Sequence, residues 1–167
     1  EADCLYAGII IDTNNFTSKA GVRTFEAAAF LRRCGADVTR VRKMFRSDMA
    51  EYKAKAEAVR HAQLYHGFAI SVCPTENIES PTIVGAQAAN ELLNINDVKA
   101  SIVLTDYQHK TYVSARSIDE VNVQVLMERM GGGGHMNMAG AQLECGVEEA
   151  IEIVKHTIDK LHEEGEF

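Results

Sequence analysis

The stretch RMGGGGHMNMAGAQL (residues 129–143) decides how the second half of the chain folds. Four consecutive glycines, Gly131–Gly134, end in His135, and small apolar residues follow. In a helix or strand each glycine costs about 0.5–1 kcal/mol relative to alanine, so the run needs a compensating role. One interpretation is a flexible linker. The other is a row of backbone N–H groups, unshielded by Cβ atoms, that binds a phosphate together with His135 and the nearby Asn137.

The patterns on both sides of the glycines predict an α/β domain. From residue 66 onward the order is strand, helix, strand, strand, helix, strand, helix. The strand-like runs are residues 68–72, 101–107, 111–117 and 138–145, and the helix-like runs are residues 80–93, 119–130 and a last helix with Ile151, Val154, Ile158 and Leu161 on one face. The glycine run therefore joins a helix to a strand within one domain.

The first part of the chain predicts a strand followed by helices. Cys4–Ile11 is a short apolar run with β-branched residues, typical of a buried strand, and Asp12 follows at its carboxyl end. Asp48 is placed to cap a longer helix that connects the two parts of the chain. The helices are expected over residues 24–34, 39–45 and 48–64, and the domain boundaries at 1–47, 48–65 and 66–167.

The composition limits the classes of partner. The chain has 167 residues, with 17 basic against 24 acidic side chains and a formal charge of -7, which argues against binding long nucleic acid. A pocket for a small anion is still compatible with that charge. The four cysteines form no CxxC pair and predict buried free thiols in a reducing compartment. No apolar run approaches the length of a membrane-spanning helix.

Two further sets of polar residues are candidates for a site. In residues 111–117, alternation places Tyr112, Ser114 and Arg116 on one face of the strand. That face is either simply solvated or, beside the glycines, a phosphate site in which Arg116 pairs with the anion. Asp12 is either a cap of the following turn or a ligand at the edge of the sheet. One carboxylate cannot form a two-metal site by itself.

These residues resemble the DHH/DHHA1 family of phosphoesterases. The stretch from Gly131 to Leu143 is similar to the GGGH signature of the DHHA1 domain, and Ala7–Asp37 is similar to the end of a DHH domain. Both blocks resemble in particular the membrane-anchored GdpP-type cyclic-di-AMP phosphodiesterases. The resemblance implies a DHHA1-type α/β domain with a mixed sheet, preceded by the last strand and helices of a truncated DHH domain.

The resemblance also implies roles for the candidate residues. Asp12 matches the last aspartate ligand of a site for two manganese ions. A second group matches positions that contact the phosphates or nucleotide of the substrate: Ser114, Arg116, Gly132, Gly133, Gly134 and His135. Asn137 is added to this group from its place beside the glycines. The substrate implied is cyclic-di-AMP, hydrolysed to pApA.

The earlier motifs of the family do not occur in these residues, so the chain is expected to be a fragment. The missing DHH half would supply the other metal ligands, and the fragment alone is expected to bind nucleotide without hydrolysing it. The parent protein is expected to be anchored in the plasma membrane, with this part in the cytoplasm. A short-oligonucleotide exonuclease or nanoRNase and a non-enzymatic nucleic-acid-binding accessory domain stay open. So does a homodimer formed through an exposed strand edge in residues 1–45.

Overall fold

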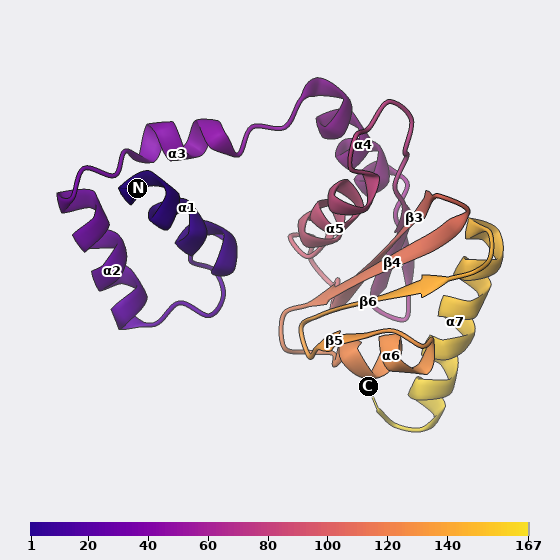
Figure 1. Ribbon diagram of the computed structural model, residues 1–167. Coiled ribbons are helices and arrows are strands. Elements are labelled where there is room, and N and C mark those ends of the chain that lie inside the picture. The colour runs from indigo at the N-terminus through magenta and orange to yellow at the C-terminus, as the bar shows by residue number, and fades with distance from the viewer. Residues whose placement is uncertain (167) are drawn as a thin grey trace. The chain divides into compact units, whose positions relative to one another are not determined.

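The computed structural model describes residues 1–166. The chain divides between Ser47 and Asp48 into an N-terminal and a C-terminal unit, each with its own packing (Figure 1). The two units are described separately below.

The C-terminal unit is built on a six-stranded mixed sheet within the described residues. Strand order is β1-β2-β3-β4-β6-β5, in which β2 and β3 run parallel and the other neighbours are antiparallel. The strands are β1 (Gln63–Tyr65), β2 (Phe68–Val72), β3 (Ala100–Tyr107), β4 (Lys110–Ser117), β5 (Gly133–His135) and β6 (Met138–Leu143). The α/β fold with a mixed sheet is therefore confirmed.

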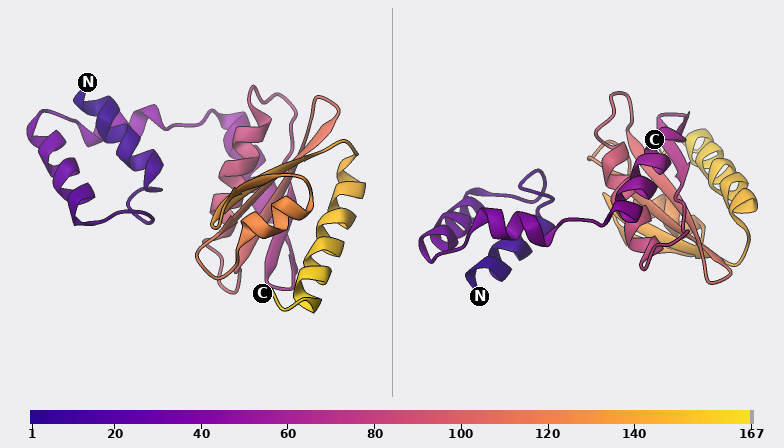
Figure 2. Two further views of the ribbon diagram at one scale, coloured as in Figure 1. Left: turned by 60° about the horizontal axis from the view of Figure 1, so that its bottom comes forward. Right: turned by 90° about the horizontal axis from the view of Figure 1, so that it is seen from above.

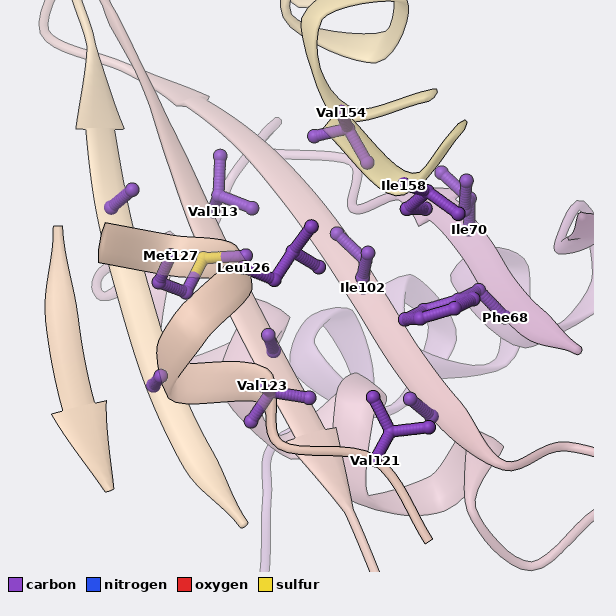
Figure 3. Close-up of a cluster of buried hydrophobic side chains, with 14 of the residues drawn as sticks. Phe68, Ile70, Ile102, Val113, Val121, Val123, Leu126, Met127, Val154 and Ile158 are labelled. Atoms are coloured by element: carbon purple, nitrogen blue, oxygen red, sulfur yellow. The ribbon is translucent and has the colours of Figure 1, made fainter. Parts of the chain in front are cut away.

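Helices cover both faces of this sheet (Figures 1 and 2). On one face, α6 (Val123–Arg129) and α7 (Val147–Glu163) pack on a large apolar cluster that includes Phe68, Ile102 and Val113 (Figure 3). On the other face, α4 (Met49–Arg60) and α5 (Pro81–Leu92) pack on a smaller cluster around Ala69 and Val103. The first cluster fixes β4, which carries Ser114 and Arg116, and β6, which pairs with the glycine strand β5.

Close contacts between α5 and β3 hold that helix on the sheet. Gly85 faces the side chain of Thr105, and an added Cβ at Gly85 would lie 2.2 Å from Thr105 Oγ1. The Ser101 hydroxyl donates to the carbonyl of Ala89 at 2.6 Å. Small residues on the helix thus allow its close approach to β3.

Two elements of the C-terminal unit differ from the sequence-based prediction. The helix expected to reach residue 64 ends at Arg60, because residues 63–65 pair with β2 as strand β1. The helix expected from Asp119 begins at Val123, capped by the Asn122 side chain, which accepts from the backbone N–H of Gln124.

The N-terminal unit contains three helices, and the strand predicted at Cys4–Ile11 is wrong. These residues lie in helix α1 (Ala2–Asp12), followed by α2 (Val22–Arg33) and α3 (Val38–Met44). Among residues 1–47 there is no strand with which this segment could pair. A helix satisfies its backbone N–H and C=O groups internally, whereas a lone strand leaves them unpaired. A short apolar run cannot distinguish the two by its pattern alone.

Polar contacts and a small aromatic cluster hold this unit together. The Asp3 carboxylate accepts hydrogen bonds from the Asp37 backbone N–H at 2.6 Å and from Arg40 Nε at 2.7 Å. These bonds connect α1 to the start of α3 and lower the pKa of Asp3, with the Arg40 bond as the larger cause. The Phe16 ring stacks on Phe25 at 5.2 Å.

The predictions about cysteines and strand edges need correction. All four cysteines are free thiols, but Cys73 alone is buried, Cys145 is half-buried, and Cys4 and Cys34 are exposed. The strand edge expected to mediate dimerisation in residues 1–45 is absent, because Cys4–Ile11 lies in helix α1 and residues 1–47 contain no strand. None of the helices in the described part of the chain has the length and apolar character needed to cross a bilayer.

Candidate functional site

Strand β4 presents alternate side chains to opposite faces of the sheet, as its sequence predicts. Val113 and Ala115 are buried in the cluster beneath α6 and α7. Tyr112, Ser114 and Arg116 point to the opposite face and are half-buried. This alternation creates a polar face on a strand whose other side belongs to the core.

The register of three neighbouring strands extends this face toward the glycine run. Arg116 lies opposite Met138 on β6, which lies opposite His135 on β5. One row along, Ser114 lies opposite Gly140, which lies opposite Gly133. Directly paired residues point to the same face of a sheet. The structure therefore brings Ser114, Arg116, Gly133 and His135 to one face, which we call the β4–β6–β5 face.

The first two glycines end helix α6, and their N–H groups are already used. Gly131, with φ of +77°, donates to the carbonyl of Glu128 at 3.0 Å. Gly132 donates to the carbonyl of Met127 at 2.8 Å. This pair of bonds is a Schellman motif, in which a residue in the left-handed conformation follows the helix. Neither N–H is therefore available to a phosphate in the predicted row of amides.

The remaining glycines form an edge strand rather than a loop. Gly134 has φ of +149°, and an added Cβ would lie 2.5 Å from both Ala139 Cα and the Met138 carbonyl oxygen. At Gly132 an added Cβ would lie 2.1 Å from the Gly140 carbonyl oxygen. An added Cβ at Gly133 meets nothing within 4 Å. Backbone packing against β6 thus explains Gly132 and Gly134, and the positive φ at the end of α6 explains Gly131. Because it is ordered inside the sheet, it is not a flexible linker.

A pocket of about 600 Å³ lies on the β4–β6–β5 face. Its floor includes Ser114 and Gly140, and its walls include Gly132, Tyr112 and Thr82 from the first turn of α5. Gln142 and Glu144 lie at its β6 end. Gly140 and Gln142 were not singled out by the sequence analysis. The alternation of MAGAQL could have indicated them, since Ala139 and Ala141 are the buried members of that strand.

Arg116 has a buried hydrogen-bond donor on this face that no other described residue satisfies. Its Nη1 donates to the carbonyl of Ala115 at 2.8 Å, whereas its Nε is buried without a hydrogen-bond partner in the structure of residues 1–166. Burial lowers the pKa of Arg116 from its ordinary value, because the charged form is desolvated. A guanidinium nevertheless stays protonated at physiological pH. An anion bound here would both satisfy Nε and offset the desolvation.

His135 and Asn137 occupy different surroundings. His135 is exposed on β5, in the same row as Arg116. The Asn137 amide instead donates to the Asp119 carboxylate at 2.6 Å, and its Oδ1 is buried without a partner among the described residues. The Asn137 carbonyl also accepts from the Ser117 N–H at 3.1 Å. Asn137 thus holds the turn between β5 and β6, and in this structure its amide nitrogen is directed to Asp119.

Asp12 belongs to the N-terminal unit and lies at the end of helix α1, not at the end of a strand. Its side chain is exposed. Residues 1–166 contain no group of three or more His, Cys, Asp or Glu side chains that could hold a metal ion. The residues described here therefore do not form a manganese site by themselves.

Comparisons with known proteins show the family of the chain. The DHHA1 domain family matches residues 68–163. The chain is 42% identical over 170 aligned residues to the cyclic-di-AMP phosphodiesterase GdpP of Bacillus subtilis, and 42% identical over 146 to the cyclic-di-AMP phosphodiesterase PdeA of Listeria monocytogenes. These alignments cover 99% and 86% of this chain but 26% and 22% of those proteins. The chain thus spans about a quarter of the length of these relatives.

The fold also matches a solved structure, an exopolyphosphatase-related protein from Bacteroides fragilis. The TM-score is 0.84 at 22% sequence identity, covering 96% of this chain and 50% of that one. At this identity the likeness shows a shared fold.

Proposed function

Because the chain belongs to the DHHA1 domain family, we propose that it is the substrate-binding part of a phosphodiesterase that hydrolyses cyclic-di-AMP to pApA. Its relatives at 42% identity are named cyclic-di-AMP phosphodiesterases, which supports this substrate. The chain binds the dinucleotide on its β4–β6–β5 face.

The observation that carries the proposal is the unpartnered Nε of Arg116. A half-buried arginine that has an unpartnered donor, and no acidic partner among residues 1–166, suits a phosphate. A guanidinium can donate two parallel hydrogen bonds to one anion. His135 lies in the same row and Ser114 in the next, and both can donate to the same ligand. Gly133 leaves the intervening surface free of side chains.

Hydrolysis needs groups beyond those described here. In the whole protein, Asp12 would act as one ligand of a manganese site whose other ligands lie on further parts of the protein, and the metal would supply an activated water. The chain alone therefore binds nucleotide and does not hydrolyse it. The membrane anchor and the cytoplasmic location expected for the parent protein stay predictions. A homodimer of this chain also stays a prediction, although the segment expected to supply its strand edge is a helix.

Isothermal titration calorimetry tests the proposal with cyclic-di-AMP, pApA and a short RNA as separate ligands. We expect the two dinucleotides to bind more tightly than the RNA, and Arg116→Ala to weaken dinucleotide binding by about tenfold or more, because a charge-assisted hydrogen bond is lost. The control is Arg60→Ala, which removes an arginine that is 75% exposed on α4.

Three results would contradict parts of the proposal. Equal binding by Arg116→Ala and the unaltered chain would remove Arg116 from the site. Tighter binding of the RNA would favour the oligonucleotide-degrading alternative. Manganese-dependent hydrolysis of cyclic-di-AMP by the chain alone would overturn the division of roles between this part and the rest of the protein.

A further inference from the structure

We propose that the Tyr112 end of the pocket binds a nucleobase, with Tyr112 as the stacking surface and Gln142 as the residue that selects adenine. This inference rests on the proposed function, because it assumes that the phosphate of the same nucleotide binds near Arg116. It assigns roles to two residues that phosphate binding does not use.

The two ends of the β4–β6–β5 face differ in chemical character. Tyr112 and Arg116 are four residues apart on the same face of β4, which corresponds to about 13 Å along the strand. The Arg116 end carries a guanidinium and, in the same row, the imidazole of His135. The Tyr112 end carries an aromatic ring and a neutral amide. A nucleotide has the same two-part character, with an anionic phosphate at one end and an aromatic base at the other.

Tyr112 is placed to offer an aromatic surface. It lines the pocket, is half-buried, and its ring centroid lies 6.3 Å from that of Tyr107 at an angle of 53°. This pairing restricts the Tyr112 ring before any ligand arrives. Stacking of a base on an aromatic side chain contributes about 1–3 kcal/mol of binding free energy.

Gln142 lies directly opposite Tyr112, on strand β6. Its side chain lines the pocket and is exposed, so its amide is accessible to a ligand. A glutamine amide carries one acceptor and one donor group, which matches the N6 amino group and N7 of adenine. Guanine presents two acceptors, O6 and N7, at the corresponding positions. The amide therefore favours adenine.

The surroundings of Tyr112 leave room for a base and reduce the repulsion between the Glu144 carboxylate and a phosphorylated ligand. The floor next to Tyr112 consists of Ser114 and Gly140, of which one is small and the other lacks a side chain. Glu144, at the rim, accepts a hydrogen bond from Lys110 Nζ at 2.6 Å. That pairing raises the pKa of Lys110 and partly neutralises the Glu144 charge, so a phosphorylated ligand meets less repulsion there.

Titration of AMP, GMP and ribose 5-phosphate into the chain and its variants tests the inference. Ribose 5-phosphate has the phosphate and sugar but no base. We expect Tyr112→Ala to weaken AMP binding between about 5-fold and 150-fold, while ribose 5-phosphate binding stays unchanged. Tyr112→Phe keeps the ring and should keep the AMP affinity within about threefold, since one hydroxyl contact contributes little. Gln142→Ala should reduce the preference for AMP over GMP.

The outcomes separate this inference from the proposed function. If Arg116→Ala weakens both AMP and ribose 5-phosphate while Tyr112→Ala changes neither, the phosphate site stands and the base site is wrong. If Tyr112→Ala weakens both ligands equally, its effect is structural and the base site is again wrong. If none of the three ligands binds to the unaltered chain while pApA does, the base site is wrong and the proposed function stands. If pApA does not bind either, the proposed function is wrong as well.

Discussion

Gly133 and Gly134 are neighbours in one strand, yet the structure predicts different consequences for replacing them with alanine. At Gly134 the backbone has φ of +149°, a conformation that side chains rarely adopt. An added Cβ would also lie 2.5 Å from Ala139 Cα and from the Met138 carbonyl oxygen, both part of the paired strand β6. These are main-chain contacts, so no side-chain rotation can relieve them.

The magnitude for Gly134→Ala follows from these two effects. Forcing a residue into an unfavourable backbone conformation costs about 1–3 kcal/mol, and overpacking costs about 1–3 kcal/mol more. We therefore expect the free energy of unfolding to fall by about 2–6 kcal/mol. Since 1 kcal/mol corresponds to a shift of about 2–8 °C in domains of this size range, the Tm should fall by at least about 4 °C.

Gly133→Ala is the matched control, because a Cβ at Gly133 meets nothing within 4 Å. Its methyl group would extend from the β4–β6–β5 face, so we expect little change in Tm but weaker binding of pApA. Thermal unfolding followed by circular dichroism, together with calorimetry, measures both quantities. Equal Tm values for Gly134→Ala and the unaltered chain would refute the explanation of the glycine run by backbone packing. Unchanged pApA binding by Gly133→Ala would refute its place in the site.

Two further predictions concern the stability of each unit. Gly85→Ala should lower the free energy of unfolding by about 1–3 kcal/mol through overpacking against Thr105 Oγ1, and adding Thr105→Ala should recover part of the loss. Chemical denaturation of the unaltered chain, the two single variants and the double variant checks both effects. Additive losses in the double variant would contradict the contact. Asp3→Asn should destabilise residues 1–47 at pH 7. Because the folded-state pKa of Asp3 is lowered, its contribution is present above the unfolded pKa of about 3.9 and is lost as the pH falls through the folded value. The Tm difference between Asp3→Asn and the unaltered chain should therefore shrink toward low pH, and a difference that is independent of pH would contradict the role of the carboxylate.

The sequence predicted the strands that carry side-chain patterns. Phe68–Val72 was predicted with the bounds that the structure has, and alternation in β4 placed Ser114 and Arg116 on the open face. These predictions succeeded because burial on one side of a strand, or on both, leaves a readable pattern of apolar residues. The antiparallel pairing of β4 with β6, and of β6 with β5, then brings these strands alongside β4.

The sequence could not predict elements that depend on partners elsewhere in the chain. Strand β5 consists largely of glycine and has no side-chain pattern, so its strand character comes from pairing with β6. The run at Cys4–Ile11 is apolar on all sides and fits a strand or a helix equally well until its neighbours are known. The use of the Gly131 and Gly132 N–H groups by helix α6 likewise depends on where that helix ends.

The structure of the chain with bound pApA, determined by crystallography, tests the central claim most directly. We predict a ligand phosphate within hydrogen-bond distance of the Arg116 guanidinium, on the face shared with Ser114, Gly133 and His135. A dinucleotide bound on another surface, with Arg116 Nε still unpartnered, would contradict the account.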